Sequence, residues 1–373
     1  MRRILTCLLV ALLATLPLSA AAQTLRSQEH SFQVVKLVEG LEQPWSLAFL
    51  PDGRILVTEK AGRLRVVSQG KLLPEPIEGL LQVTVHGQGG LHDVVLHPDF
   101  KSNQLVYLAY AARGSDGVGT ELARGRLVGQ RLENVEVLFR QSPKGRAGQH
   151  FGGRIVFDRQ GYLYLTLGDR GERDRAQLPD DHAGSVIRLH DDGRVPKDNP
   201  FVGRSGWKPE KFTLGNRNMQ GAALHPQSGL LWIHEHGPQG GDEVNVIRAG
   251  RNYGWPVITF GVNYGIGTKI GEGTRKEGME QPLYYWVPSI APSGMAFYTG
   301  ERFPRWKGNL FVGALRDQML VRLQLDGEKV VKEERLLKGM LGRIRDVRMG
   351  PDGYLYLLND QSHAVLARLE PAS

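Results

Sequence analysis

Cysteine is nearly absent from this chain, and the only one, Cys7, lies in an N-terminal segment that we expect to be removed. The remaining chain can therefore form no disulfide and offers no thiol nucleophile. An oxidising compartment is tolerated but not exploited. Catalysis by cysteine is excluded.

The sequence also lacks an apolar run long enough for a membrane span. The uncharged apolar stretch from Ile4 to Leu18 is shorter than the ~20 residues that a spanning helix needs. It follows two arginines and precedes three alanines ending at Ala22, which is the pattern of a secretory signal peptide. A membrane anchor is the alternative, but no polybasic stop follows. We therefore predict a signal peptide over 1–22, cleavage near Ala22, a single domain over 23–373, and a periplasmic or secreted protein without membrane insertion.

A strong charge excess is missing as well. Once the two leader arginines are removed, 45 basic residues face 39 acidic ones, a net charge of +6. This modest excess does not favour nucleic acid as a partner, but it suits an anionic small ligand if the basic groups converge. Hydrophobic residues at 41% and charged residues at 23% are typical of a folded chain with a core.

Turn-forming residues are abundant, with 47 glycines and 20 prolines, and they punctuate a repeated phrase. In each copy two short β-prone runs flank a turn, often of the Pro-Asp-Gly type. The six copies cover Trp45 to Thr58, Leu91 to Tyr110, Gly153 to Thr166, Gly221 to Ile233, Gly294 to Gly313, and Arg345 to Leu358.

Each phrase predicts a β-hairpin, and the spacing of the phrases leaves room for about four strands per unit. The sequence therefore predicts an all-β fold, a six-bladed β-propeller. A β-sandwich or barrel of similar strand content is the alternative, but neither requires a repeated phrase. No linker-like change in composition divides the chain.

Propellers bind ligands where the loops of all blades meet, so functional residues should stand at equivalent blade ends. Glycine-rich segments lie there, among them GQGG from Gly87, GQHFGGR from Gly148, GNRNMQG from Gly215 and GRIRD from Gly342. One histidine and four arginines fall in such positions: His150, Arg217, Arg316, Arg343 and Arg345.

Guanidinium groups that face one channel repel each other unless an anion lies between them. Their forked geometry matches carboxylates, so a planar ligand with several carboxylates is indicated. For any one arginine, pairing with a local acid such as Asp346 is the simpler interpretation. His150, placed among glycines beside this predicted anion site, is a candidate general base, although a structural role is the usual one for a single histidine.

A second candidate site lies in the segment from His234 to Asn245, which crowds imidazoles, acids and glycines. His234 and His236 with nearby carboxylates suggest a transition metal, but no third ligand is evident. A turn that offers backbone carbonyls near Glu243 suits Ca²⁺, which prefers such oxygens. Both interpretations remain open from the spacing.

Taken together, these motifs resemble the soluble, exported glucose/sorbosone dehydrogenases that use pyrroloquinoline quinone (PQQ), in particular the aldose sugar dehydrogenase branch. The likeness covers essentially the whole mature chain and is carried by Gly148 to Arg154, Gly215 to Asn218, Glu235 to Glu243 and Arg343 to Asp346. It implies a six-bladed propeller, PQQ on the channel axis, bound Ca²⁺ and oxidation of an aldose sugar at C1 to a lactone.

The resemblance also implies roles for single residues. His150 is similar to the catalytic base, which takes the proton from the anomeric hydroxyl while the C1 hydride passes to C5 of PQQ. Gly237 and Pro238 resemble the turn whose carbonyls hold the Ca²⁺ that touches PQQ, and Glu243 and Tyr253 resemble ligands of a structural Ca²⁺. The implied PQQ contacts are Gln88, Arg217, Asn218, Tyr264, Arg316, Arg343 and Arg345.

The chain departs from the glucose-specialised members of this family at three positions. Gln149 stands where they carry aspartate, Arg316 where they carry lysine, and His236 where they carry glutamine. These differences keep the charge of the cofactor site, but they do not support specificity for glucose. A calcium-dependent propeller lactonase and a non-enzymatic carbohydrate-binding propeller are the alternatives. We expect a monomer with an unknown electron acceptor.

Overall fold

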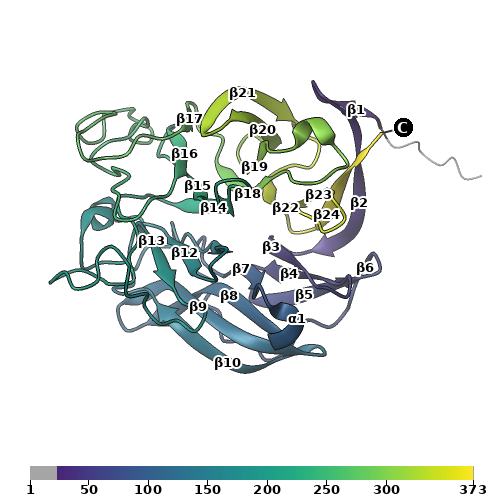
Figure 1. Cartoon of the computed structure of the whole chain (residues 1–373), viewed down its shortest axis with the longest axis horizontal. Coiled ribbons are helices and arrows are strands. Elements are labelled where there is room, and N and C mark those ends of the chain that lie inside the picture. Colours follow the sequence, from purple (N-terminus) through teal and green to yellow (C-terminus); the bar gives the residue numbers. More distant parts are fainter. Residues whose placement is uncertain (1–22, 373) are drawn as a thin grey trace, which may run out of the picture.

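Six small antiparallel sheets stand in a ring around a central axis, which makes the protein a six-bladed β-propeller (Figure 1). The computed structural model describes residues 23–372, so the predicted signal peptide lies outside the described residues. The predicted fold class is confirmed. No helix within residues 23–372 has the length and apolar character needed to cross a membrane.

Blades 1 to 3 follow each other along the chain. Blade 1 contains β3 (Pro44–Phe49), β4 (Ile55–Glu59), β5 (Arg63–Ser68) and β6 (Lys71–Leu72). Blade 2 contains β7 (Leu91–Leu96), β8 (Leu105–Gly114), β9 (Gly117–Val128) and β10 (Arg131–Arg140), with the short helix α1 (Phe100–Asn103) between its first two strands. Blade 3 contains β11 (Ile155–Phe157), β12 (Leu163–Leu167) and β13 (Ser185–Leu189), with the 3₁₀ turn η1 (Arg173–Gln177).

Blades 4 to 6 complete the ring. Blade 4 contains β14 (Met219–Leu224), β15 (Leu231–Glu235), β16 (Asp242–Val246) and β17 (Tyr284–Trp286). Blade 5 contains β18 (Pro292–Phe297), β19 (Leu310–Ala314), β20 (Met319–Asp326) and β21 (Lys329–Leu336), with η2 (Pro304–Trp306). Blade 6 contains β22 (Ile344–Met349), β23 (Leu355–Asn359), β24 (Ala364–Pro371), β2 (Ser31–Leu41) and β1 (Leu25–Arg26).

All six predicted hairpins are confirmed, and each forms the first two strands of a blade. In the first, the Leu50 amide donates to the Arg54 carbonyl at 2.8 Å across a turn in which Gly53 takes φ +89°. Only glycine adopts this left-handed backbone at no steric cost. The turn residues therefore fix where each blade folds back on itself.

Blade 3 has three strands where the repeat predicts about four. The place of the fourth strand is taken by an irregular segment, which lies beside β13 around a bridge between Ile187 and Lys211, where the Arg188 amide donates to the Glu210 carbonyl at 2.9 Å. This segment contains Pro196, Pro200 and Pro209, and proline has no N–H for a strand ladder.

The two ends of the described chain close the ring in blade 6. The N-terminal strand β2 pairs antiparallel with the C-terminal strand β24, with Val34 opposite Leu369. The strands of this blade therefore come from both ends of the described chain (Figure 1). Because β2 occupies the edge of β24, the ring cannot open without breaking this ladder.

Eight hydrophobic clusters form the core within residues 23–372, and six of them lie between two neighbouring blades rather than at the axis. Alternate residues of each strand point to opposite faces of its sheet, so every blade contributes to two clusters. Burial of these apolar faces drives the stacking of the blades. The axis is left to polar side chains.

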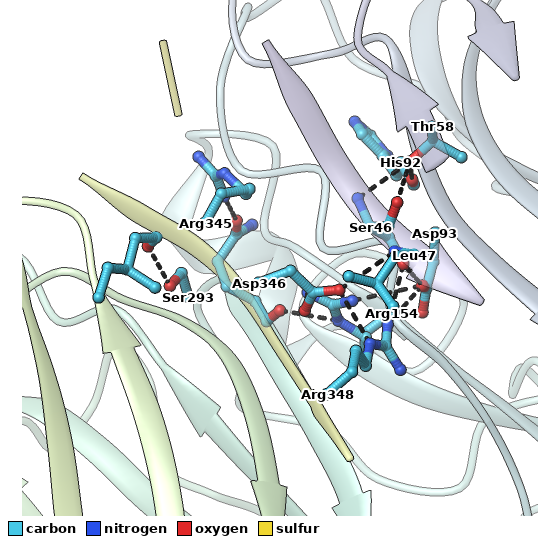
Figure 2. Close-up of polar contacts among 12 residues, drawn as sticks. Ser46, Leu47, Thr58, His92, Asp93, Arg154, Ser293, Arg345, Asp346 and Arg348 are labelled. Atoms are coloured by element: carbon cyan, nitrogen blue, oxygen red, sulfur yellow. Dashed lines mark hydrogen bonds and ion pairs between the residues drawn. The ribbon is translucent and has the colours of Figure 1, made fainter. Parts of the chain in front are cut away.

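An axial ion cluster, defined as Asp93, Arg154, Asp346 and Arg348, joins the innermost strands (Figure 2). Arg154 lies 3.3 Å from Asp93 and 3.2 Å from Asp346, and Arg348 lies 2.7 and 2.8 Å from the same two carboxylates. Both acids and Arg154 are fully buried. The two positive and two negative charges balance, as burial of ions requires.

Candidate functional site

A cavity of about 360 Å³ opens on the axis at one end of the ring, and all six blades contribute to its wall. This volume suits a small ligand or cofactor. The polar and aromatic side chains in its wall include Trp45, Lys60, Gln88, His92, Asn218, Gln220, His236, Arg343, Arg345 and Asp360. The structure thus brings Gln88, Asn218, Arg343 and Arg345 together, as the sequence predicts.

His150 lies beside this cavity in a loop between blades 2 and 3. Its main-chain N–H donates to the Gln88 side chain at 2.9 Å, and its Nδ1–H donates to the Asp169 carboxylate at 2.6 Å. Among residues 23–372 no hydrogen bond reaches its Nε2. An ionised carboxylate only accepts, so the proton of the neutral imidazole sits on Nδ1 and the lone pair on Nε2 is free to take a proton.

The surroundings of His150 favour its neutral form. Burial lowers the pKa of His150 below its ordinary value, the hydrogen bond to Asp169 opposes this shift, and the charge of Arg217 adds to it. Burial raises the pKa of Asp169, but the hydrogen bond from His150 and the charge of Arg217 outweigh it, so the pKa of Asp169 lies below its ordinary value. The pair therefore consists of a carboxylate and an uncharged imidazole near neutral pH.

The two arginines of the GRIRD motif meet at Asp360, not at Asp346. Arg343 donates to the Asp360 carboxylate at 2.9 and 3.0 Å, and Arg345 lies 3.6 Å from it. Arg345 also donates to the Gln220 side chain at 2.9 Å, and burial lowers its pKa. Since Lys60 lines the same cavity, three cations face one carboxylate, and the wall carries an excess of positive charge.

The other two predicted arginines lie apart from this group. Arg217 is buried and donates to the carbonyls of His236 at 3.0 Å and Gly237 at 2.7 Å. Arg316 donates to the Ser289 carbonyl at 2.7 Å and lines a neighbouring cavity together with Tyr264. That cavity shares His236 and Ala291 with the axial one, so the two are adjacent parts of one site.

Glu235, which is buried, and Glu243, which is partly buried, lie opposite each other on β15 and β16. The Asn245 amide donates to both, at 3.3 and 3.2 Å. Burial raises the pKa of Glu235 to about 7, and burial together with repulsion by Glu235 raises the pKa of Glu243. They line an interior cavity of about 10 Å³, close to the space of one water or ion, together with Tyr253. A cation there would neutralise the negative charges of the two facing carboxylates.

The donor atoms fit Ca²⁺ here better than at the predicted Gly237–Pro238 turn. The Gly237 oxygen already accepts from Arg217, a cation that would repel Ca²⁺. The Tyr253 hydroxyl donates to the Val246 carbonyl at 2.6 Å and accepts from the Arg248 amide at 2.9 Å, which leaves its main-chain oxygen for a metal. In the part of the chain that the structure describes, no group of three or more histidines and acids is placed to hold a metal ion.

A transition-metal site at the two histidines is not supported by this geometry. The His236 Nε2 bonds to the Pro292 carbonyl, and His234 lies on β15 fully buried, with neither ring nitrogen hydrogen-bonded within residues 23–372. Burial lowers the pKa of both histidines. Both therefore remain neutral, His234 in the interior and His236 in the wall of the cavity.

Sequence analysis did not predict several residues of this site, above all Asp169, Trp255 and Asp360. The Trp255 indole N–H donates to Asp169 at 2.8 Å, which fixes the carboxylate that binds His150. The sequence did carry a signal for two of them, because Asp169 and Asp360 lie within two residues of the end of the second strand of a repeated hairpin. In an antiparallel hairpin the end of the second strand lies at the same edge as the start of the first.

Comparison with known proteins agrees with this geometry. The family model described as "Glucose / Sorbosone dehydrogenase" matches residues 41–368. The chain is 45% identical to the aldose sugar dehydrogenase YliI of Escherichia coli (strain K12) over 361 residues, which cover 95% of this chain and 97% of that protein.

Two solved structures are similar over the whole ring. The apo form of the soluble aldose sugar dehydrogenase from Escherichia coli has a TM-score of 0.89 at 46% identity, with 91% of this chain and 100% of that chain covered. The PQQ-bound form of the aldose sugar dehydrogenase from Streptomyces coelicolor has a TM-score of 0.74 at 26% identity, with 91% of this chain and 98% of that chain covered.

Proposed function

Because the chain belongs to the glucose/sorbosone dehydrogenase family and is a PQQ-type sugar oxidoreductase, we propose that it oxidises aldose sugars at C1 to lactones. One observation carries this proposal. All six blades converge on a cavity lined by arginines, and a neutral histidine held by a buried carboxylate lies beside it. An anionic redox cofactor and a general base are what such an oxidation needs.

The residues present fit PQQ, which carries three carboxylates. Arg343, Arg345 and Lys60 face one cavity with Asp360 as their shared counter-charge, and the buried Nε of Arg217 has no hydrogen-bond partner within residues 23–372. We propose that these cations, with Gln88, Asn218, Arg316 and Tyr264, hold the cofactor. When bound, PQQ supplies the acceptor for the hydride of the sugar.

The chain's own chemistry is proton removal. The free Nε2 of His150 takes the proton of the anomeric hydroxyl, and a positioned base of this kind contributes about 10² to 10⁴ in rate. Asp169 holds the imidazole in the required tautomer and stabilises the imidazolium that forms. The sugar loses this proton and the C1 hydride, which leaves the lactone.

The proposal also includes a bound Ca²⁺ ion. We propose one Ca²⁺ between Glu235 and Glu243, with the Tyr253 main chain nearby, where it would stabilise the fold. The site predicted at Gly237 and Pro238 stays a prediction, because it requires Arg217 to release the Gly237 oxygen. We also propose a monomer that acts outside the cytoplasm after removal of residues 1–22.

Reconstitution tests the proposal. Purified apoprotein should reduce an artificial redox dye with aldoses only after PQQ and Ca²⁺ are added, and the product should be a lactone. His150→Ala should abolish turnover while PQQ still binds, as measured by fluorescence titration. Lactone hydrolysis without quinone, or sugar binding without dye reduction, would contradict the proposed reaction.

A further inference from the structure

Arg170 is a fully buried cation that forms no ion pair within residues 23–372. Its ordinary alternatives are a carboxylate partner or exposure to water, and it has neither. Burial lowers its pKa to about 10, so it stays protonated at neutral pH. A charge kept in the interior without a counter-ion requires a reason in what it binds.

Its partners are main-chain oxygens of the loop that carries His150 and of strand β9. The guanidinium donates to the carbonyl of Ala147 at 2.6 Å and to that of Gln149. It also donates to the Val118 carbonyl at 3.1 and 3.3 Å, which ties the loop to blade 2. The Phe151 ring lies beneath it, 3.4 Å from the guanidinium carbon to the ring centre.

The loop that Arg170 holds has a backbone that needs support. His150 takes φ +55° and Arg170 takes φ +59°, a left-handed conformation that is unfavourable for residues other than glycine. The Arg170 amide donates to the His150 carbonyl at 3.3 Å, so the two left-handed residues are joined directly. A Cβ at Gly168 would lie 2.1 Å from the same carbonyl, which shows how closely the two segments approach.

We propose that Arg170 is a positioning residue for His150: its guanidinium fixes residues 147–151 from the interior, so that the imidazole stays against Asp169 with Nε2 free. Asp169 then holds the imidazole ring of His150, and Arg170 holds the backbone of the loop that carries it. This inference rests on the proposed function only for its effect on turnover. Its effect on the loop is independent of the reaction.

Arg170 also contributes to the electrostatics of the base. The charged and titratable groups that face His150 are Asp169, Arg170, Arg217 and His236. Of these, the two arginines disfavour the imidazolium. Loss of the Arg170 charge therefore raises the pKa of His150, and the acid limb of the rate profile moves to higher pH.

Three variants separate geometry, charge and burial. Arg170→Lys keeps the positive charge but lacks the planar guanidinium that donates to three carbonyls at once. Arg170→Met removes both the charge and the hydrogen-bond donors. Arg322→Met is the matched control, because Arg322 is equally buried but pairs with Glu334 at 2.7 Å in blade 5, away from the cavity.

The measurements are kcat, KM and the pH profile with PQQ added, PQQ affinity from fluorescence titration, and hydrogen exchange and the His150 titration by NMR in the apoprotein. We expect kcat to fall about 100-fold in both Arg170 variants, since a small misplacement of a catalytic group has this cost. KM and PQQ affinity should stay near wild type. Only Arg170→Met should move the acid limb upward.

The apoprotein readouts keep the inference decidable. Both Arg170 variants should show faster amide exchange at residues 147–151, and Arg322→Met should not. If exchange there is unchanged, or if kcat per folded molecule matches that of Arg322→Met, the positioning role is wrong. If wild-type protein oxidises no aldose, the proposed function fails, and the role of Arg170 is judged by loop exchange and the His150 titration alone.

Discussion

The carboxylate of Asp169 decides whether His150 can act as a base. Three donors converge on it: the His150 Nδ1–H at 2.6 Å, the Gly171 amide at 2.8 Å and the Trp255 indole N–H at 2.8 Å. In Asp169→Asn one carboxylate oxygen becomes an NH₂ group. If that group faces Trp255, two donors meet in a buried place, which costs about 1–3 kcal/mol. If it faces His150, it meets the Gly171 amide, which donates to the same oxygen, so each orientation leaves one donor unpaired and the imidazole loses its carboxylate in both.

The orientation that turns the NH₂ toward His150 has a direct catalytic consequence. The NH₂ donates to Nδ1, so the imidazole proton moves to Nε2, and Nε2 can no longer accept a proton from the sugar. The corresponding change in a Ser-His-Asp triad lowers kcat by about 10⁴. For a base that contributes 10² to 10⁴, we expect kcat to fall by about 10² to 10⁴. PQQ affinity should hardly change, because Asp169 is not among the residues that line the cavity.

Steady-state dye reduction with added PQQ measures this effect, and fluorescence titration measures the cofactor affinity. Asp158→Asn is the matched control, since Asp158 accepts two amides in the turn at the far end of the same hairpin. Any residual activity should keep its acid limb at lower pH than wild type, because the Asp169 charge raises the pKa of His150. A kcat of Asp169→Asn close to that of Asp158→Asn would refute the assignment of His150 as the base.

Three further outcomes follow from the other contacts. Replacing Arg343 and Arg345 by alanine should raise the PQQ dissociation constant at least tenfold, since each charge-assisted hydrogen bond contributes about 1.5–3 kcal/mol; an unchanged constant in a fluorescence titration would contradict the cationic wall. Metal-free protein should lose thermal stability as the pH rises above 4.5, because the pKa values of Glu235 and Glu243 are raised in the fold, and Ca²⁺ should remove this loss. Glu243→Gln should abolish the response of Tm to Ca²⁺, and a wild-type response in that variant would place the ion elsewhere. Arg154→Met should lower the free energy of unfolding by about 3–5 kcal/mol, measured by denaturant titration, because Asp93 and Asp346 then share one cation.

The fold could be predicted from the sequence because each blade repeats a local signal. Apolar alternation and a turn such as the one at Gly53 specify a hairpin without reference to the rest of the chain. The exception is blade 3, where prolines interrupt the last strand. The pairing of β2 with β24 gives no such signal, since it joins residues more than 300 positions apart.

The site was predicted only in part, for a physical reason. Glycine-rich segments mark the starts of the inner strands, which predicted Arg343 and Arg345 at this site, and the family resemblance added Gln88 and Asn218. The partners that fix them, such as Asp169 and Asp360, come from other parts of the chain, and only the ring brings them within hydrogen-bond distance. Which acid pairs with which arginine is a property of the assembled blades, so the expected partner Asp346 gave way to Asp360.

The pairing of β2 with β24 also determines when the cofactor can bind during folding. Until β24 has been synthesised, blade 6 is incomplete and Arg343, Arg345 and Asp360 have no fixed place. A nascent chain therefore has no complete axial cavity to fill. The quinone can therefore bind only after the ring of blades has closed. A chain truncated before β24 would bind no quinone.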